Sequence, residues 1–143
     1  MKVVDLNILL HAVNASSPRH ERIRSWWEDA LSGDEPVGLA WIVLLGFLRI
    51  STQANVFPKA MTPEEAANRI EAWLQRPNVK LVGEGEDHWP RLRTLIFKTG
   101  TAGNLTTDAH LAAVAMRHGA TLVSCDNDFA RFAGLRWENP LVG

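Results

Sequence analysis

The sequence predicts a three-layer α/β domain built on a short, mostly parallel sheet of about four or five strands. Short β-branched or apolar runs alternate along the chain with segments whose apolar residues recur every three or four positions. Strands that alternate with helices are joined by right-handed crossovers, which makes the strands parallel and covers both faces of the sheet. No linker-like composition divides the 143 residues, so we expect one domain over residues 1–143.

The first third of the chain indicates two short strands, each followed by a helix. The pattern changes from β-branched residues to helical spacing at Asp5, and Pro18 opens a further helix that ends near Gly33. The segment 41–50 is apolar nearly all round, with Arg49 as its one charge, which indicates a buried helix. We therefore expect strands at 2–4 and 37–39, and helices at 6–13, from Pro18 to about Gly33, and at 41–50.

The remainder of the chain continues the alternation. Thr62-Pro63-Glu64-Glu65 combines a capping residue, a proline at the first helical position and a glutamate three residues after the cap. Gly100 and Gly119 each follow a helical pattern and are expected to end it. We therefore expect strands at 79–82, 120–125 and 135–137, and helices beginning near Thr62, at Glu86 and at Thr107.

Composition limits the classes of function. Hydrophobic residues make up 46% of the chain, so a substantial core can form. The formal charge of −1 excludes a protein held to nucleic acid mainly by a global basic excess. The one cysteine, Cys125, excludes a disulfide framework and a cysteine zinc cluster. We expect a cytoplasmic protein without a membrane segment, because no signal-peptide pattern or membrane-length apolar run is present.

Four aspartates fall where a parallel sheet would gather them. Asp5 comes directly after the first strand, and Asp108 stands at the start of a helix. Asp126 follows the strand at 120–125, and Asp128 comes two residues later. The carboxyl ends of parallel strands and the starts of the following helices share one edge. Carboxylates at close range either acquire raised pKa values or share a cation, and oxygen-only donors suit Mg²⁺ or Mn²⁺.

Each of these residues also has a purely structural explanation. Asp5 and Asp108 can cap the helices that follow them. The segment Asp126-Asn127-Asp128 can form an ordinary turn. Taken one at a time, the structural explanation is the more common one. Taken together, the four residues are explained equally well by a metal site and by a set of caps and turns.

Four ordered segments resemble the motifs of the PIN-domain family, and of its VapC toxins in particular. They are residues 3–7, VVDLN; 41–52, WIVLLGFLRIST; 103–113, GNLTTDAHLAA; and 120–132, ATLVSCDNDFARF. The tail GLRWENPL also fits the family. The resemblance therefore runs from one end of the chain to the other.

The resemblance implies a PIN-like fold and a type II toxin that hydrolyses RNA phosphodiester bonds with Mg²⁺ or Mn²⁺. It implies Asp5, Asp108 and Asp126 as catalytic residues and metal ligands. It also implies Asp128 as a further metal ligand.

The same resemblance extends to neighbouring residues and partners. It places Asn7 and Ser124 as polar groups next to the ligands. It also implies a homodimer that is neutralised by a small VapB-type antitoxin, a segment of which enters the acidic pocket.

One position departs from the family pattern. Many PIN domains carry a glutamate in the second motif, where this chain has Gly46. No acid lies between Pro36 and Pro63, so realignment within this segment supplies none. Either the aspartates suffice, or the chain binds metal less tightly, or it is catalytically weak. The alternative function is therefore a weak or inactive PIN-like protein that binds RNA or a partner.

Two further polar residues are candidates for substrate contact. Arg49 interrupts an apolar helix and could pair with a site carboxylate, contact a phosphate or reach a backbone carbonyl. Asn104 could orient Asp108 or a water molecule, although a Gly-Asn turn explains it equally well. The six tryptophans are expected mainly in the core or at a dimer interface.

Other α/β functions fit less well. A dinucleotide-binding protein needs a glycine-rich turn after the first strand, and none follows Asp5. An aspartyl phosphoryl-transfer domain would want a second acid where this chain has Asn7. We therefore expect hydrolysis of single-stranded or loop RNA by a metal-activated water.

Overall fold

The structure is a computed structural model that describes residues 1–142 and contains a five-stranded sheet in the order β3-β2-β1-β4-β5. All four strand pairings are parallel. The strands are β1 (Lys2–Val4), β2 (Val37–Ala40), β3 (Val79–Val82), β4 (Thr121–Val123) and β5 (Trp137–Glu138). The chain moves outward from β1 to β3 and then crosses to β4 on the other side of β1. The boundary between β1 and β4 is therefore the topological switch point, where ligand sites form in such sheets.

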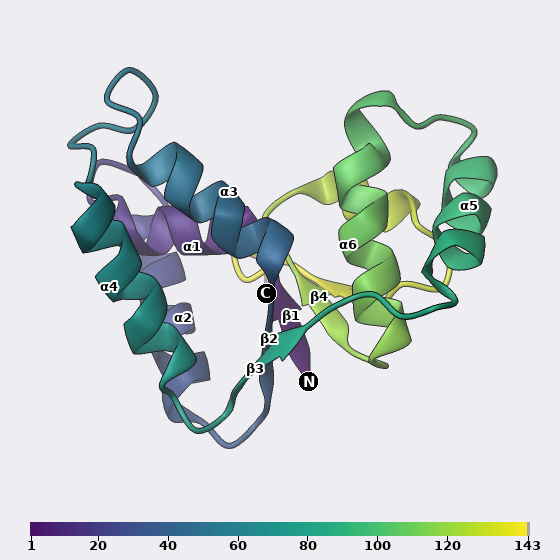
Figure 1. The fold of residues 1–143 in the computed structure, drawn as a ribbon, viewed down its shortest axis with the longest axis horizontal. Helices are drawn as coiled ribbons and strands as arrows, with labels where there is room; N and C mark the ends of the chain where they lie inside the picture. Colours follow the sequence, from purple (N-terminus) through teal and green to yellow (C-terminus); the bar gives the residue numbers. More distant parts are fainter. Residues whose placement is uncertain (143) are drawn as a thin grey trace.

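Helices cover both faces of the sheet, which confirms the three-layer prediction. Figure 1 shows α1 to α4 gathered on one side of the strands and α5 and α6 on the other. The helices are α1 (Leu6–Val13), α2 (His20–Ser32), α3 (Trp41–Ser51), α4 (Pro63–Leu74), α5 (His88–Thr99) and α6 (Thr106–Arg117). Two short 3₁₀ turns, η1 (Gly103–Leu105) and η2 (Asn127–Arg131), precede α6 and follow β4.

Small residues let α6 pack closely against the sheet. Its alanines 109, 112, 113 and 115 are all at most 1% exposed. The strand residues Val3 and Val4 are fully buried between the two helical layers. A strand buried on both faces needs apolar residues at consecutive positions, which explains the continuous runs in the sequence.

Local signals fix several helix ends as expected. Thr62 Oγ1 accepts a hydrogen bond from the Glu65 backbone N–H at 3.1 Å, and Glu65 Oε1 accepts one from the Thr62 N–H at 3.3 Å. This reciprocal pair is the predicted capping box. Gly100 and Gly119 follow α5 and α6 with φ values of 75° and 60°, a conformation that favours glycine.

Several boundaries differ from the predictions. β4 ends at Val123, two residues before the predicted end of the strand, and β5 begins at Trp137. The prediction that the helix at 41–50 is buried was wrong for one face. Trp41 and Leu45 are 55% and 58% exposed, because α3 packs on the body of the protein mainly through Val43, Leu44, Gly46 and Phe47. In residues 1–142, no helix has the length and apolar character needed to cross a membrane.

Candidate metal centre

Asp5 lies at the point where β1 ends and α1 begins. Its backbone is extended (φ −81°, ψ 162°), and its Oδ1 accepts a hydrogen bond from the Leu6 N–H at 2.7 Å. Asp5 therefore caps α1, as the structural explanation expected. Its own N–H donates to the Val123 carbonyl at 2.9 Å, which holds it against the end of β4.

Ser124 connects the acids of the two central strands. This fully buried residue donates from Oγ to Asp5 Oδ2 at 2.8 Å, although the two are 119 positions apart. The same oxygen accepts hydrogen bonds from the Asp126 N–H and from Asn7 Nδ2, both at 3.0 Å. Asn7 also donates to Asp5 Oδ2 at 3.3 Å and accepts from the Cys125 N–H at 3.2 Å. Ser124 and Asn7 thus lie next to Asp5 and Asp126.

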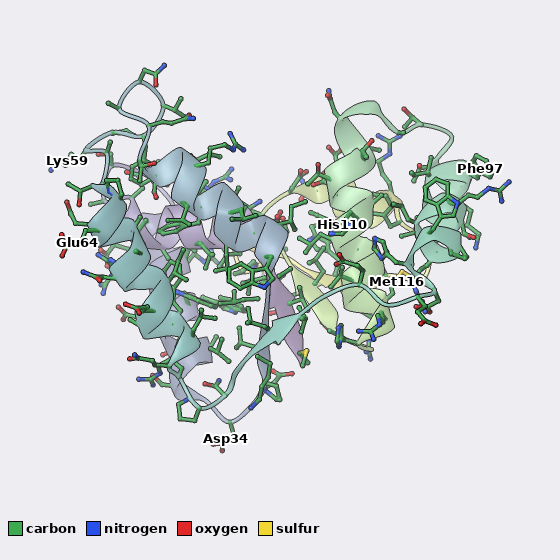
Figure 2. All side chains as sticks on the ribbon, viewed as in Figure 1. Asp34, Lys59, Glu64, Phe97, His110 and Met116 are labelled. Carbon is green, nitrogen blue, oxygen red and sulfur yellow. The ribbon has the colours of Figure 1, made fainter. Side chains whose placement is uncertain are left out.

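Three aspartates form a tight cluster at this edge. Oxygen atoms of Asp108, Asp126 and Asp128 all lie within 4.8 Å of one another. Asp108 comes from the first turn of α6. Asp126 caps η2 by accepting the Asp128 N–H at 2.9 Å. Figure 2 labels His110, which follows Asp108 by two residues in α6.

The carboxylates are electrostatically unfavourable by themselves. Burial, followed by the charges of Asp5, Asp126 and Asp128, raises the pKa of Asp108 to about 6. Burial also raises the pKa of Asp5, opposed by the hydrogen bonds from Ser124 and Leu6, and the charge of Asp126 raises it further.

In the described part of the chain, this charge is not compensated by an ion pair. Within residues 1–142, none of the ion pairs includes any of the four aspartates. The donors are oxygen atoms only, several of them within reach of one centre. Such a donor set fits a hard divalent cation such as Mg²⁺ or Mn²⁺.

A small cavity adjoins the acids. It has a volume of about 150 Å³ and is lined by Asp5, Leu6, Ile42, Val43, Thr107, Asp108 and Leu111. Larger hollows of about 280 and 430 Å³ lie around Gly33 and Asp34. Those hollows border the starts of the strands, whereas ligands of open parallel sheets bind at the opposite edge.

Gly46 is a packing position and not an open one. A Cβ atom on Gly46 would lie 2.7 Å from Leu6 Cδ2, inside van der Waals contact. The glycine therefore lets α3 pack closely against α1 beside Asp5. A side chain at position 46 would displace the end of the Leu6 side chain. The acids of this site come from the end of β1, from α6 and from the segment after β4.

The two other predicted substrate residues do not join the cluster. Arg49 is exposed in the last turn of α3 and forms no ion pair within residues 1–142. Asn104 is exposed in η1, and no side-chain hydrogen bond joins it to Asp108.

Sequence reasoning missed three residues at the site. Thr107 and Ile42 line the cavity, and Trp137 Nε1 donates to the Ser124 carbonyl at 3.1 Å. The place of Thr107 next to a predicted ligand was a signal for it. Ile42 had none, since it is an apolar residue within an apolar segment, and Trp137 was expected only as a core or interface tryptophan.

Comparison with known proteins supplies the family. Residues 2–135 match the model of the PIN domain. Ribonuclease VapC37 of Mycobacterium tuberculosis is 44% identical over 140 residues, which are 98% of this chain and 97% of the relative. Ribonuclease VapC33 of the same species is 42% identical and covers 99% of both chains.

Solved structures share the fold. VapBC2 from Rickettsia felis, bound to a DNA fragment from its promoter, has a TM-score of 0.72 at 18% identity and covers 96% of this chain and 97% of its own. VapC20 of Mycobacterium tuberculosis, a toxin that cleaves the sarcin–ricin loop, has a TM-score of 0.68 at 18% identity over 95% of this chain and 99% of its own. The full-length sequence matches and the fold together show that this chain belongs to the PIN-domain family and, within it, to the VapC group.

Proposed function

We propose that this protein is a metal-dependent endoribonuclease and the toxin of a type II toxin–antitoxin pair. The observation that carries the proposal is the convergence of Asp108, Asp126 and Asp128 within 4.8 Å, with Asp5 beside them at the switch point of the sheet. VapC37 and VapC33 are named ribonucleases and match this chain over nearly their whole length. This supports the same reaction class for this chain.

The four aspartates are the residues that would hold Mg²⁺ or Mn²⁺. A cation held by them would be a Lewis acid for a phosphoryl oxygen and would stabilise negative charge on the leaving oxygen. It also reconciles an acidic site with a polyanionic substrate. Without it, the four carboxylates would repel a phosphate group.

The surrounding residues orient the ligands. The Ser124 hydroxyl and the Leu6 N–H hold opposite oxygens of Asp5, which fixes the plane of that carboxylate. The Asp128 N–H holds Asp126 Oδ1. Outer hydrogen bonds of this kind set the geometry of ligating carboxylates. The chain's own contribution is thus a set of four carboxylates at the edge where β1 and β4 end, of which Asp5 and Asp126 are oriented by hydrogen bonds.

The non-cleaving alternative rested on Gly46. The comparisons give it no support, since the full-length relatives are named ribonucleases. The contact between Leu6 and the Gly46 position gives the glycine a packing role of its own. Four aspartates without the glutamate are therefore the working ligand set.

The partners follow from the same assignment. Solved VapBC structures are toxin–antitoxin complexes, and we propose a VapB-type antitoxin for this chain, with a segment that enters the acidic pocket. We further propose that the chain acts in the cytoplasm as a homodimer on single-stranded or loop RNA.

Cleavage of a labelled total-RNA extract by the purified, antitoxin-free protein tests the function. We expect discrete fragments with Mg²⁺ or Mn²⁺ and none with EDTA. Asp5→Asn and Asp126→Asn should each lower the rate by about 100-fold or more, because a ligand of the cation is lost. Asp34→Asn is the matched control, since Asp34 is an exposed acid on the loop before β2 (Figure 2).

Circular dichroism of each variant checks that it is folded. Wild-type cleavage by folded Asp5→Asn, or cleavage that persists in EDTA, would contradict the metal mechanism. Absence of cleavage from folded wild type with either metal would contradict the nuclease assignment for that RNA pool.

A further inference from the structure

A row of polar groups runs along α1, away from the acids. Asn7, which accepts a hydrogen bond from the Cys125 N–H, lies one helical turn before His11, on the same face of α1. His11 Nδ1 and Ser17 Oγ are 2.8 Å apart, and Ser17 Oγ accepts a hydrogen bond from the Arg19 N–H at 3.1 Å. The loop after α1 is therefore folded back onto the helix face that begins beside the acids.

Arg19 brings a positive charge to the end of this row. Its side chain is exposed, and no ion pair includes it within residues 1–142. Glu21, an acid at the start of α2, pairs with Arg24 at 3.2 Å instead. Burial raises the pKa of the Cys125 thiol, and the charge of Arg19 acts against this rise. The field of Arg19 therefore reaches Cys125, the residue that directly precedes Asp126.

The place of Arg19 is unfavourable for the helix that it begins. The 13-residue helix α2 starts directly after Arg19, whose side chain makes no capping hydrogen bond. The start of a helix is electropositive, so an acid stabilises it and a cation does not. A cation that supports neither its helix nor an ion pair indicates a ligand of opposite charge.

An RNA strand carries such charges at the required place. A strand with one phosphate held at the aspartates through a cation has further phosphates on either side of it. The aspartates would repel these neighbouring phosphates, which need positive groups outside the acid cluster. Arginine suits this contact because its planar guanidinium donates two parallel hydrogen bonds to a phosphate.

We propose that Arg19 binds a phosphate of the RNA strand close to the one held at the aspartates, and that the strand follows the Asn7 and His11 face of α1. The proposal rests on the proposed ribonuclease function and deepens it by assigning a substrate contact and a path for the strand. Arg19 does not line the small cavity beside the acids. The contact is therefore separate from the antitoxin segment proposed for the acidic pocket.

Fluorescence anisotropy of a short labelled oligouridine in Mg²⁺ tests the contact. The Asp126→Asn protein serves as the parent, so that cleavage does not consume the probe. We expect Arg19→Gln to weaken binding by about fivefold to tenfold at low salt. The slope of log affinity against log salt concentration should fall by about 0.7, the value for one phosphate of a single strand. Arg19→Lys keeps the charge and should keep the slope.

Arg69→Gln is the matched control. Arg69 is an exposed arginine on α4, which Figure 1 shows on the outer side of its helical layer, away from β4. In the described part of the chain it also belongs to no ion pair. This variant loses the same charge and should keep the affinity and the slope of the parent.

Thermal unfolding separates a substrate contact from a structural role. Arg19→Gln should unfold at a slightly higher temperature than its parent, because a cation is removed from the start of α2. A structural role for Arg19 predicts a lower unfolding temperature. Weaker RNA binding in a more stable variant is the result that the proposal requires.

An unchanged salt slope in folded Arg19→Gln, or an equal decrease in Arg69→Gln, would overturn the contact. An acidic peptide is the rival ligand, and oligoglutamate of the same length is its probe. If Arg19→Gln loses affinity for oligoglutamate but binds oligouridine like its parent, Arg19 serves an acidic partner and the proposal fails. Cleavage by proteins that retain Asp126 is a separate readout. Arg19-dependent RNA binding without cleavage rejects the nuclease assignment alone, and cleavage by Arg19→Gln at the wild-type KM rejects the contact alone.

Discussion

Leu6 and Gly46 form a steric pair at the point where α1 meets α3. Leu6 Cδ2 lies 2.7 Å from the position of a Cβ atom on residue 46. Leu6 directly follows Asp5, so this packing contact also supports the start of the helix that Asp5 caps. The departure from the family's glutamate is therefore matched by a neighbour that fills the space.

Gly46→Ala should be coupled energetically to Leu6→Ala. In wild type the added methyl group meets the end of the Leu6 side chain, which has to turn away, so the change should gain less than the roughly 1 kcal/mol that helix propensity offers. With Leu6 truncated, the same change should instead stabilise the protein by about 1 kcal/mol through helix propensity. Urea unfolding of the two single variants and the double variant measures the coupling. Gly83→Ala is the control, since a Cβ there meets nothing within 4 Å. Additive effects of the two changes would refute the steric pair.

Ser124→Ala should weaken metal binding by more than its effect on folding stability would explain. The change removes the hydroxyl that bridges Asp5, Asn7 and the Asp126 backbone. Loss of such an outer hydrogen bond lowers metal affinity by about 10–100-fold. Calorimetric titration with Mn²⁺ measures this. Ser51→Ala is the control, because Ser51 is equally buried but bonds only the Phe47 carbonyl within α3. Equal metal affinity of both variants would refute the bridging role.

Much of the site could be predicted because it depends on topology. Asp5 and Asp126 converge because parallel strands end at one edge, and this holds whatever the details of packing. Asp108 joins them because the start of α6 lies at the same edge. The position of Ser124 came from the family resemblance alone, since a small polar residue near a strand end has no distinctive pattern.

Other features depend on three-dimensional packing that no local pattern encodes. The segment 41–50 is apolar on every face, so periodicity could not separate the buried Phe47 from the exposed Trp41. The cavity lined by Ile42 depends on the spacing of three helices. The packing of Gly46 against Leu6 could not be predicted either. A helix sequence does not show which neighbouring side chain lies against a glycine.

Asp108→Asn should stabilise the metal-free protein near neutral pH. The pKa of Asp108 in the folded protein is about 6, above the ordinary value of 3.8. The folded state therefore binds more protons between these values, and the free energy of unfolding falls as pH rises through them. Asp108→Asn removes this decrease in the free energy of unfolding. The decrease is on the order of 1 kcal/mol once solvent screening of the half-exposed carboxyl group is allowed for.

Thermal unfolding in EDTA between about pH 4 and 7 measures the slope of the unfolding free energy against pH. This range spans the two pKa values of Asp108. Asp87→Asn is the control of opposite sign, since the hydrogen bond from Arg91 lowers the pKa of Asp87. That variant should not flatten the slope. An unchanged slope in Asp108→Asn would show that the acid cluster is not strained without a cation.

An exposed apolar surface should form the homodimer interface. Trp41 and Leu81 are 55% and 50% exposed. Leu39, two residues before Trp41, is in register with Leu81, so the two exposed residues stand at the same end of the neighbouring strands β2 and β3. Exposed apolar groups that cluster in this way mark association sites, and a buried tryptophan is often a dominant contact.

Trp41→Ser combined with Leu81→Ser should weaken self-association by about 30-fold or more, at about 2 kcal/mol for one such contact. Sedimentation velocity measures the change. Val56→Ser, at an equally exposed apolar residue between α3 and α4, should leave the dimer intact, and a double variant that still sediments as a dimer would place the interface elsewhere.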